Sequence, residues 1–231
     1  MFWMVGLALA GENMVAAVPE RAMTVGKRDL VVGLEPGVIL GGGAATWRSA
    51  VPVRIGVSDD LEVFMSPLLQ GVEPKVSDPA LGVLYRLTDG GAEVGLRVSG
   101  DLAFAGPAAH IILDAGVPVR WHASDRVAVD TGVFAVPNLS PVMSFGLRVP
   151  VAADLGLTDA VALRLGSGVA VGDLGGANAM ALPAEAGVSW TADRDGNARL
   201  QLTGGAAWGD VRTPEALTAM VGARFFIVSD R

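Results

Sequence analysis

The residues best suited to chemistry in this sequence are two histidines and one serine. His122-Ala123-Ser124 places an imidazole two residues from a hydroxyl, a pair with which a hydrolase could activate a nucleophile. His110 has no histidine or carboxylate at the spacing that a metal site needs, and the lack of cysteine in the sequence excludes thiolate metal sites and disulfides. The His122-Ala123-Ser124 pair falls at a predicted turn, so we interpret it as a plain turn. We predict no metal, no cofactor and no catalytic residue, and the protein is not expected to be an enzyme.

Arginines and carboxylates are the second source of chemistry, since opposed charges can select solutes by charge and size. Lys27 and Lys75 are the only lysines, so 15 of the 17 basic residues are arginines. Arginine suits crowded, paired positions because its planar group makes several fixed hydrogen bonds and is weakly hydrated. The net charge of −7 argues against nucleic acid as a partner.

The composition excludes two further classes of protein. Apolar residues make up 51% of the 231 residues and charged residues only 18%, a balance that predicts collapse rather than disorder. A membrane-spanning helix needs ~20 consecutive apolar residues. The uncharged stretch over residues 132–147 is shorter and contains two prolines, so a bundle of membrane helices is excluded.

From Lys27 onward, apolar residues recur with a period of two, which is typical of β-strands. Ser-Asp and Thr-Asp pairs punctuate these segments, and they suit turns because their side chains bind nearby backbone amides. Four prolines fall inside the predicted strands, where we expect bulges: Pro36, Pro52, Pro118 and Pro150. The twelve predicted strands cover residues 29–40, 46–57, 60–67, 80–87, 92–101, 110–122, 126–136, 142–152, 159–171, 182–192, 197–208 and 217–228.

The charged residues in the middle of these strands fall on one face, opposite the large apolar residues. Glycine is frequent on the same face, although glycine weakens a strand unless something needs the space. A soluble sandwich or barrel would turn its polar face to open water, where no such space is needed. We therefore predict an inverted layout, with apolar side chains facing lipid and charged side chains lining a lumen. The predicted lumen-lining residues are Arg54, Arg86, Arg97, Arg120, Arg148, Arg164, Arg199, Arg224, Glu35, Glu62, Glu93, Asp114, Asp130 and Glu185.

A sheet that spans a membrane has to close, because an open edge would leave unpaired amides and carbonyls in the hydrocarbon. An even number of strands lets the first and the last pair antiparallel, and the predicted lengths suit strands that cross a bilayer at a tilt. The predicted fold class is all-β, a closed antiparallel up-and-down transmembrane β-barrel of about twelve strands.

The alternating strands and the turns Gly56-Val57-Ser58-Asp59-Asp60 and Gly156-Leu157-Thr158-Asp159 resemble those of bacterial outer-membrane β-barrel proteins, over residues 28–228. The resemblance implies a location in the bacterial outer membrane, with outer-membrane lipid as a partner. Its motifs are generic, so they indicate a class of protein and not one member.

The last strand also carries this resemblance. In that family it bears an assembly signal, which Gly222, Phe225 and Ile227 resemble. Met220 stands where a polar residue is usual, and the chain continues to Arg231 instead of stopping at an aromatic residue. The signal implies that the barrel-assembly machinery is a second partner.

Residues 1–10 are apolar and end in Ala8-Leu9-Ala10, a small-x-small pattern like that of a secretory cleavage site, but no positive charge precedes them. We assign residues 1–27 to a candidate export signal and lead-in, and residues 28–231 to the β-barrel domain.

The predicted function is that of a passive conduit for small solutes or, if the lumen is filled, of a structural membrane protein. The lumen charges would set up a field across the lumen, or they would pair with one another and only stiffen the barrel. Phe64, Phe134 and Phe226 also point inward, which indicates a narrow interior. Two alternatives are a membrane-embedded lipid hydrolase, since His122-Ala123-Ser124 resembles the pair of outer-membrane phospholipases, and a secreted soluble β-sandwich binding module.

Overall fold

The structure is a computed structural model that describes residues 23–41, 44–70, 75–105, 108–139, 143–172, 174, 180–194, 197–212 and 217–227. Within the strands, the side chains of residues 41, 44, 68–70, 75–79, 102–105, 108–110, 193–194 and 197–199 lie outside this description. Residues 1–22, which include the candidate export signal, lie outside it as well. The described residues form no helix that is long and apolar enough to cross a membrane.

The described residues form fourteen hydrogen-bonded strands. They are β1 (Leu30–Gly41), β2 (Ala44–Ala50), β3 (Val53–Gly56), β4 (Leu61–Gln70), β5 (Lys75–Arg86), β6 (Ala92–Ala105), β7 (Ala108–Ser124), β8 (Val127–Asn138), β9 (Ser144–Gly156), β10 (Val161–Val171), β11 (Met180–Ala181), β12 (Ala184–Arg194), β13 (Asn197–Trp208) and β14 (Leu217–Ile227).

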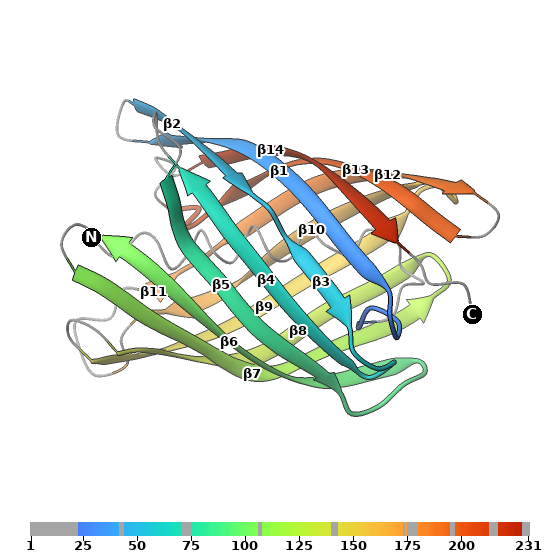
Figure 1. The fold of residues 1–231 in the computed structure, drawn as a ribbon, viewed down its shortest axis with the longest axis horizontal. Coiled ribbons are helices and arrows are strands. Elements are labelled where there is room, and N and C mark those ends of the chain that lie inside the picture. The colour runs from blue at the N-terminus through green and yellow to red at the C-terminus, as the bar shows by residue number, and fades with distance from the viewer. Residues whose placement is uncertain are drawn as a thin grey trace.

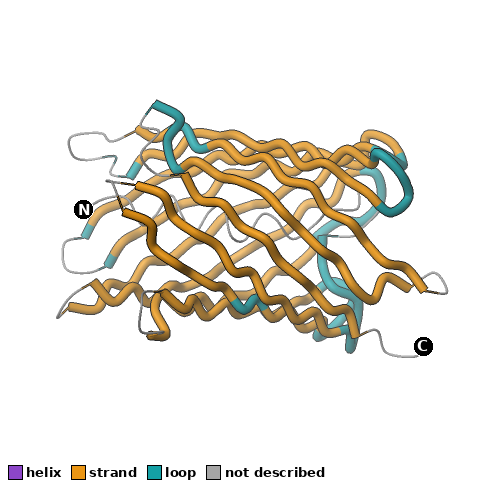
Figure 2. The backbone as a smooth tube through the Cα atoms, turned by 90° about the horizontal axis from the view of Figure 1, so that it is seen from above, coloured by secondary structure: helices purple, strands orange, loops and turns teal. Residues whose placement is uncertain are grey.

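These strands make twelve positions in one closed wall. β2 and β3 are two halves of a single wall strand, because both pair with β1 on one side and β4 on the other. β11 and β12 likewise both pair with β10. The sheet closes where β1 pairs antiparallel with β14, from Leu30 opposite Ile227 to Leu40 opposite Leu217. The result is a closed twelve-stranded antiparallel barrel of tilted strands, as Figures 1 and 2 show from two directions.

The twelve predicted strands match the twelve wall positions one to one, and the predicted fold class is confirmed. The hairpins at one end of the barrel run further than predicted: β4 reaches Gln70 and β5 begins at Lys75, whereas the predicted strands end at residue 67 and begin at residue 80. Two antiparallel strands can go on exchanging backbone hydrogen bonds after their side chains stop alternating. The short turns after β3, β5, β7, β9 and β12 lie together at the opposite end, which we call the short-turn end.

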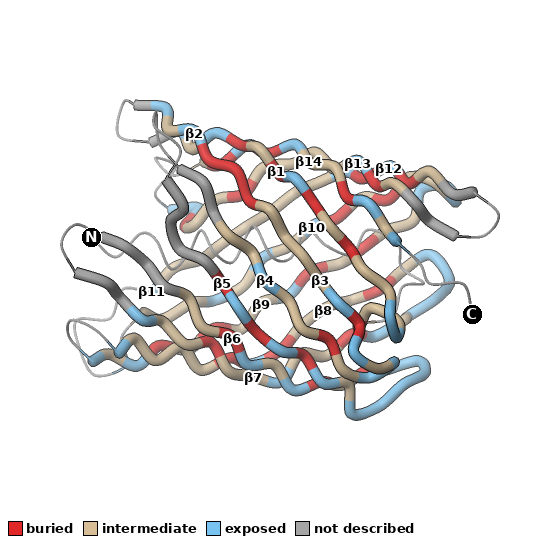
Figure 3. Tube along the Cα trace, viewed as in Figure 1, coloured by how far each residue is buried: buried red, intermediate tan, exposed pale blue. Residues whose placement is uncertain are grey.

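The distribution of exposed side chains is inverted relative to a water-soluble protein. The outer face carries large apolar side chains such as Leu81 and Val221, which are 62% and 63% exposed. The most buried large side chains are polar or charged instead, and Arg224, Glu62 and Asp154 are each less than 2% exposed. Figure 3 shows buried and exposed residues alternating along the strands. A soluble β-sandwich, with its apolar side chains packed inside, is therefore excluded.

The expected bulges at the four prolines are wrong. The register is the same on both sides of each of them, and the recorded register shifts lie elsewhere, as between Ser66 and Leu68. Three of the prolines instead face a glycine of the neighbouring strand, where a Cβ would lie 2.7 Å from Pro52 Cγ or 3.0 Å from the Cα atoms of Pro118 and Pro150. The facing glycines are Gly33, Gly132 and Gly168. The glycine makes room for the proline, so the register continues across it, although at Pro52 the wall strand is divided into β2 and β3.

Candidate functional site: the charged lumen

Alternation along each strand turns the charged side chains of the wall into the barrel interior, because every second residue points to the same face. The thirteen predicted lumen residues whose side chains the structure describes lie there, and most of them pair with an opposite charge from another strand. The side chain of Arg199 lies outside the described part. Four groups of contacts make up this lining.

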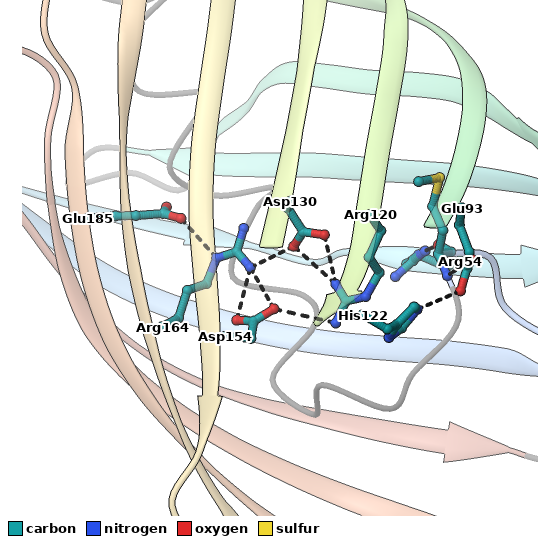
Figure 4. A network of polar contacts seen from close by, with 9 residues as sticks. Arg54, Glu93, Arg120, His122, Asp130, Asp154, Arg164 and Glu185 are labelled. Carbon is teal, nitrogen blue, oxygen red and sulfur yellow. Dashed lines mark hydrogen bonds and ion pairs between the residues drawn. The ribbon is translucent and has the colours of Figure 1, made fainter. Parts of the chain in front are cut away.

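The first group, the central network, joins β7, β8, β9, β10 and β12. Arg164 Nη1 donates to Asp130 and Asp154 at 3.0 Å each, and its Nε donates to Glu185 at 2.9 Å. Arg120 completes the group, with Nη1 2.9 Å from Asp130 Oδ1 and Nη2 3.4 Å from Asp154 Oδ2. Figure 4 shows these side chains converging on one another. Two arginines thus serve three carboxylates, and the shared carboxylates Asp130 and Asp154 hold the two arginines together.

The second group, the mouth cluster, lies near the short-turn end on β3 to β7. Arg54 makes a two-pronged contact with Glu62, with both N···O distances at 2.6 Å. Glu93 lies 3.7 Å from Arg86 and 2.9 Å from the Nε2 atom of His122. Two-pronged pairs between arginine and carboxylate fix geometry as well as charge. The mouth cluster therefore holds its two glutamates in set positions.

The third group joins strands from the two ends of the chain. Arg224 on β14 binds Glu35 on β1, and its Nε donates at 2.7 Å. Arg48 on β2 interacts electrostatically with the same carboxylate, but its Nη2 is directed at the sulfur of Met220 at 3.5 Å. Both arginines are at least 96% buried. Two cations therefore share one carboxylate here, which leaves a local excess of positive charge.

The fourth group combines arginines with the inward-pointing phenylalanines. Arg148 pairs with Asp114 and lies over the ring of Phe134, 4.5 Å from its centre. Arg97 lies over the ring of Phe64 at 4.7 Å. A guanidinium over an aromatic face is attracted by the ring quadrupole, so each phenylalanine fixes the position of a lumen cation.

The predicted lumen-lining set left out three members of this lining: Arg48, Asp154 and His122. Alternation along β9 places Asp154 on the same inward face as Arg148, but the predicted strand ended at residue 152. Arg48 lies on the same inward face as Arg54, and continuing the alternation across Pro52 would have identified it. His122 was placed on the polar face of its strand with Arg120, but it was left out of the predicted lumen-lining set and weighed only as a candidate catalytic base.

The arrangement gives no support to a hydrolase. His122 Nε2 is bonded to Glu93, and Ser124 Oγ accepts a hydrogen bond from the backbone amide of Arg126. Ser124 itself is the last residue of β7 and is exposed. Among the described residues, no group of three or more histidines and carboxylates is placed to hold a metal ion.

Comparison with known proteins adds evidence at the level of the fold. No protein-family model matches the sequence, and no curated protein has a significantly similar sequence. The NanC porin superimposes with a TM-score of 0.65 at 11% identity, covering 84% of this chain and 98% of that one. The KdgM porin gives 0.61 at 9% identity, covering 87% and 99%. An outer-membrane channel of Pseudomonas putida F1 gives 0.61 at 13% identity, covering 89% and 97%. The chain therefore has the fold of the outer-membrane β-barrel porins.

Proposed function

We propose that this protein is a passive conduit for small solutes in the bacterial outer membrane. Where the structure describes the wall, its outer face carries large exposed apolar side chains, which suits lipid, and the buried charges are on the inside. The structures it resembles include porins and a channel, and the KdgM porin has also been solved in complex with disordered oligogalacturonate. We propose no catalytic role.

The observation that carries this proposal is the ring of opposed charges around the lumen. The described lining contains eight arginines and seven carboxylates, namely Arg48, Arg54, Arg86, Arg97, Arg120, Arg148, Arg164 and Arg224 with Glu35, Glu62, Glu93, Asp114, Asp130, Asp154 and Glu185. Charged rings in a narrow pore select permeating solutes by sign and size. Because the two signs nearly balance, we expect weak overall selectivity for anions.

The test uses the pair Arg148 and Asp114, which face one another across β9 and β7. The protein is reconstituted in planar lipid bilayers, and the reversal potential is measured across a salt gradient. Arg148→Gln removes one positive charge and should shift selectivity toward cations, whereas Asp114→Asn should shift it toward anions. Arg126→Gln is the matched control, because Arg126 lies in an exposed turn. Equal reversal potentials for all four proteins would refute a charge-selective conduit.

A structural role is the second candidate, and the burial of the lumen charges favours it. Asp154, Glu62 and Arg224 are almost completely buried, as expected where paired charges fill an interior. A barrel that inserts into bilayers and migrates differently before and after boiling, but carries no current at any voltage, would establish this second role.

We also propose that the barrel-assembly machinery recognises the last strand. Phe225 and Ile227 on β14 are 53% and 56% exposed on the outer face, while Gly222 points inward beside Glu35. The two apolar side chains are thus available to a partner before lipid covers them. Phe225→Ala should slow insertion into vesicles that contain the assembly machinery, with Val221→Ala on the same face as the control, and an equal effect of both changes would argue against a specific signal.

A further inference from the structure

We infer that residues 23–26, which we call the mouth segment, form the constriction of the conduit and set its size limit. The inference rests on the proposed conduit function. The mouth segment precedes β1 at the short-turn end of the barrel, where the dark blue end of the ribbon lies in Figure 1. Its backbone does not leave the barrel there, because it is bound to side chains that point into the lumen.

Three hydrogen bonds attach the mouth segment to the mouth cluster. The backbone amide of Met23 donates to Glu93 Oε2 at 2.7 Å, and that of Val25 donates to Glu62 Oε2 at 2.9 Å. Arg54 Nη2 donates to the carbonyl oxygen of Met23 at 3.0 Å. The contacts come from β3, β4 and β6, so the segment runs along the inside of the wall across these strands. Hydrogen bonds to charged groups are the stronger ones, so the segment is held firmly.

Packing against glycines holds the mouth segment close to the wall. A Cβ at Gly56 on β3 would overlap the carbonyl oxygen of Gly26, and a Cβ at Gly95 on β6 would lie 2.9 Å from the sulfur of Met23. Thr24 is 6% exposed, and its hydroxyl donates to the carbonyl oxygen of Asp59 at 2.8 Å. Only a wall without side chains at these positions accommodates the segment.

The mouth segment takes up a large part of the cross-section of a barrel of this size. Twelve strands spaced ~4.8 Å apart and tilted by ~40° enclose a backbone diameter of about 24 Å, and inward side chains leave a lumen of roughly 13 Å. An extended segment ~5 Å thick and ~10 Å wide across its side chains then fills on the order of a third of the cross-section. The mouth segment is thus large enough to decide which solutes pass.

The chemistry of the mouth segment indicates what it selects. Its four residues, Met23 to Gly26, carry no charged side chain, and two of its amides occupy Glu62 and Glu93. These two carboxylates are therefore less available to a permeating cation, and the mouth segment restricts solutes mainly by their size. Charge selection is left to the deeper groups around Asp114 and Glu35.

The first test displaces the mouth segment without changing any charge. Gly56→Ala places a methyl group where the carbonyl oxygen of Gly26 lies, whereas Gly204→Ala points into open space and is the matched control. In planar bilayers we expect Gly56→Ala to raise single-channel conductance about one-and-a-half- to two-fold and to let larger polyethylene glycols enter the pore. Gly204→Ala should behave as the unmodified protein does.

The second test does not depend on displacing the segment. The sequence has no cysteine, so Val25→Cys creates a single reactive site in the mouth segment. A positively charged methanethiosulfonate reagent added to the conducting channel should lower the current stepwise. Thr158→Cys, in the exposed turn after β9 at the same end, should leave the current unchanged after the same treatment.

The outcomes separate the constriction from the conduit itself. If the unmodified protein conducts but neither Gly56→Ala nor labelled Val25→Cys changes the current, the constriction is refuted and the conduit stands. If neither the unmodified protein nor Gly56→Ala conducts, the conduit is refuted and the constriction with it. A silent unmodified protein with a conducting Gly56→Ala variant would support both, because the segment would then close the pore.

Discussion

Arg164 offers the sharpest test of how the lumen charges are held. It contacts Asp130, Asp154 and Glu185 at 2.9–3.0 Å, with its own side chain 7% exposed and that of Asp154 only 1% exposed. Removing one partner of a buried ion pair costs about 3–5 kcal/mol, because the other charge is left without compensation. Arg120 still lies 3.4 Å from Asp154, so we expect Arg164→Gln to lower the free energy of unfolding by about 3 kcal/mol, at the lower end of that range.

The assay is urea unfolding of the refolded barrel in lipid vesicles, followed by tryptophan fluorescence and by the heat-dependent shift on gels. Arg126→Gln is the control, since the side chains of Arg126 and Asp159 are both largely exposed and such a pair contributes only about 0–1 kcal/mol. The double variant Arg164→Gln with Asp154→Asn should recover about 1–2 kcal/mol of the loss, because it removes the carboxylate that was left uncompensated.

The reasoning is refuted if Arg164→Gln costs no more than Arg126→Gln and Asp154→Asn restores nothing. That result would mean that water screens the central network, as in a wide pore. The full cost would mean that the network is sealed from water, and solutes would then have to pass beside it instead of displacing it.

Three further predictions address other parts of the barrel. Leu81→Arg on the outer face should cost about 2–4 kcal/mol of stability in vesicles, whereas Leu157→Arg in an exposed turn should cost about 0–1 kcal/mol; equal costs would contradict a lipid-facing wall. Gly132→Ala places a Cβ 2.8 Å from both the Phe134 ring and the Val117 carbonyl oxygen, so unfolding in urea should show a loss of about 1–3 kcal/mol, with Gly204→Ala near zero. Arg212 donates to the carboxylate of Asp210 in the loop after β13 and lowers the pKa of Asp210 to about 2. Because this pKa lies below the ordinary value of about 3.9, the contact stabilises the loop above about pH 4 and is lost as the pH falls toward 2. NMR titration should show the low pKa, Arg212→Ala should return it toward the ordinary value, and an ordinary value in the unmodified protein would exclude the contact.

The wall of the barrel could be predicted from the sequence because the information lies within each strand. In β9, for example, Phe145 and Val151 face outward while Arg148 is buried, as the period of two requires. Turn residues between such segments then mark where one strand ends and the next begins. Both signals are local, so they are readable without knowing which strands are neighbours.

The pairing of the lumen charges could not be predicted, because it depends on contacts between strands. Arg224 and Glu35 are 189 residues apart, and they meet only because the barrel closes between β14 and β1. Arg164 reaches three carboxylates on three other strands, and that selection is set by the stagger of β8, β9, β10 and β12. A sequence pattern places these residues inside the lumen but does not say which of them meet.

The near-exclusive use of arginine among the basic residues follows from this geometry. In the described lumen, Arg164 uses its Nε and Nη1 atoms toward three different carboxylates at once, and Arg54 uses Nε and Nη2 toward one. A planar group with five donors makes such contacts without reorienting, whereas an ammonium group concentrates its charge at a single atom. An inverted barrel has no dry apolar core to define its interior, so the ion pairs have to position the lining side chains. Replacing Arg164 with lysine would keep the charge but lose contacts to at least one carboxylate, which is why the interior depends on arginine rather than on positive charge alone.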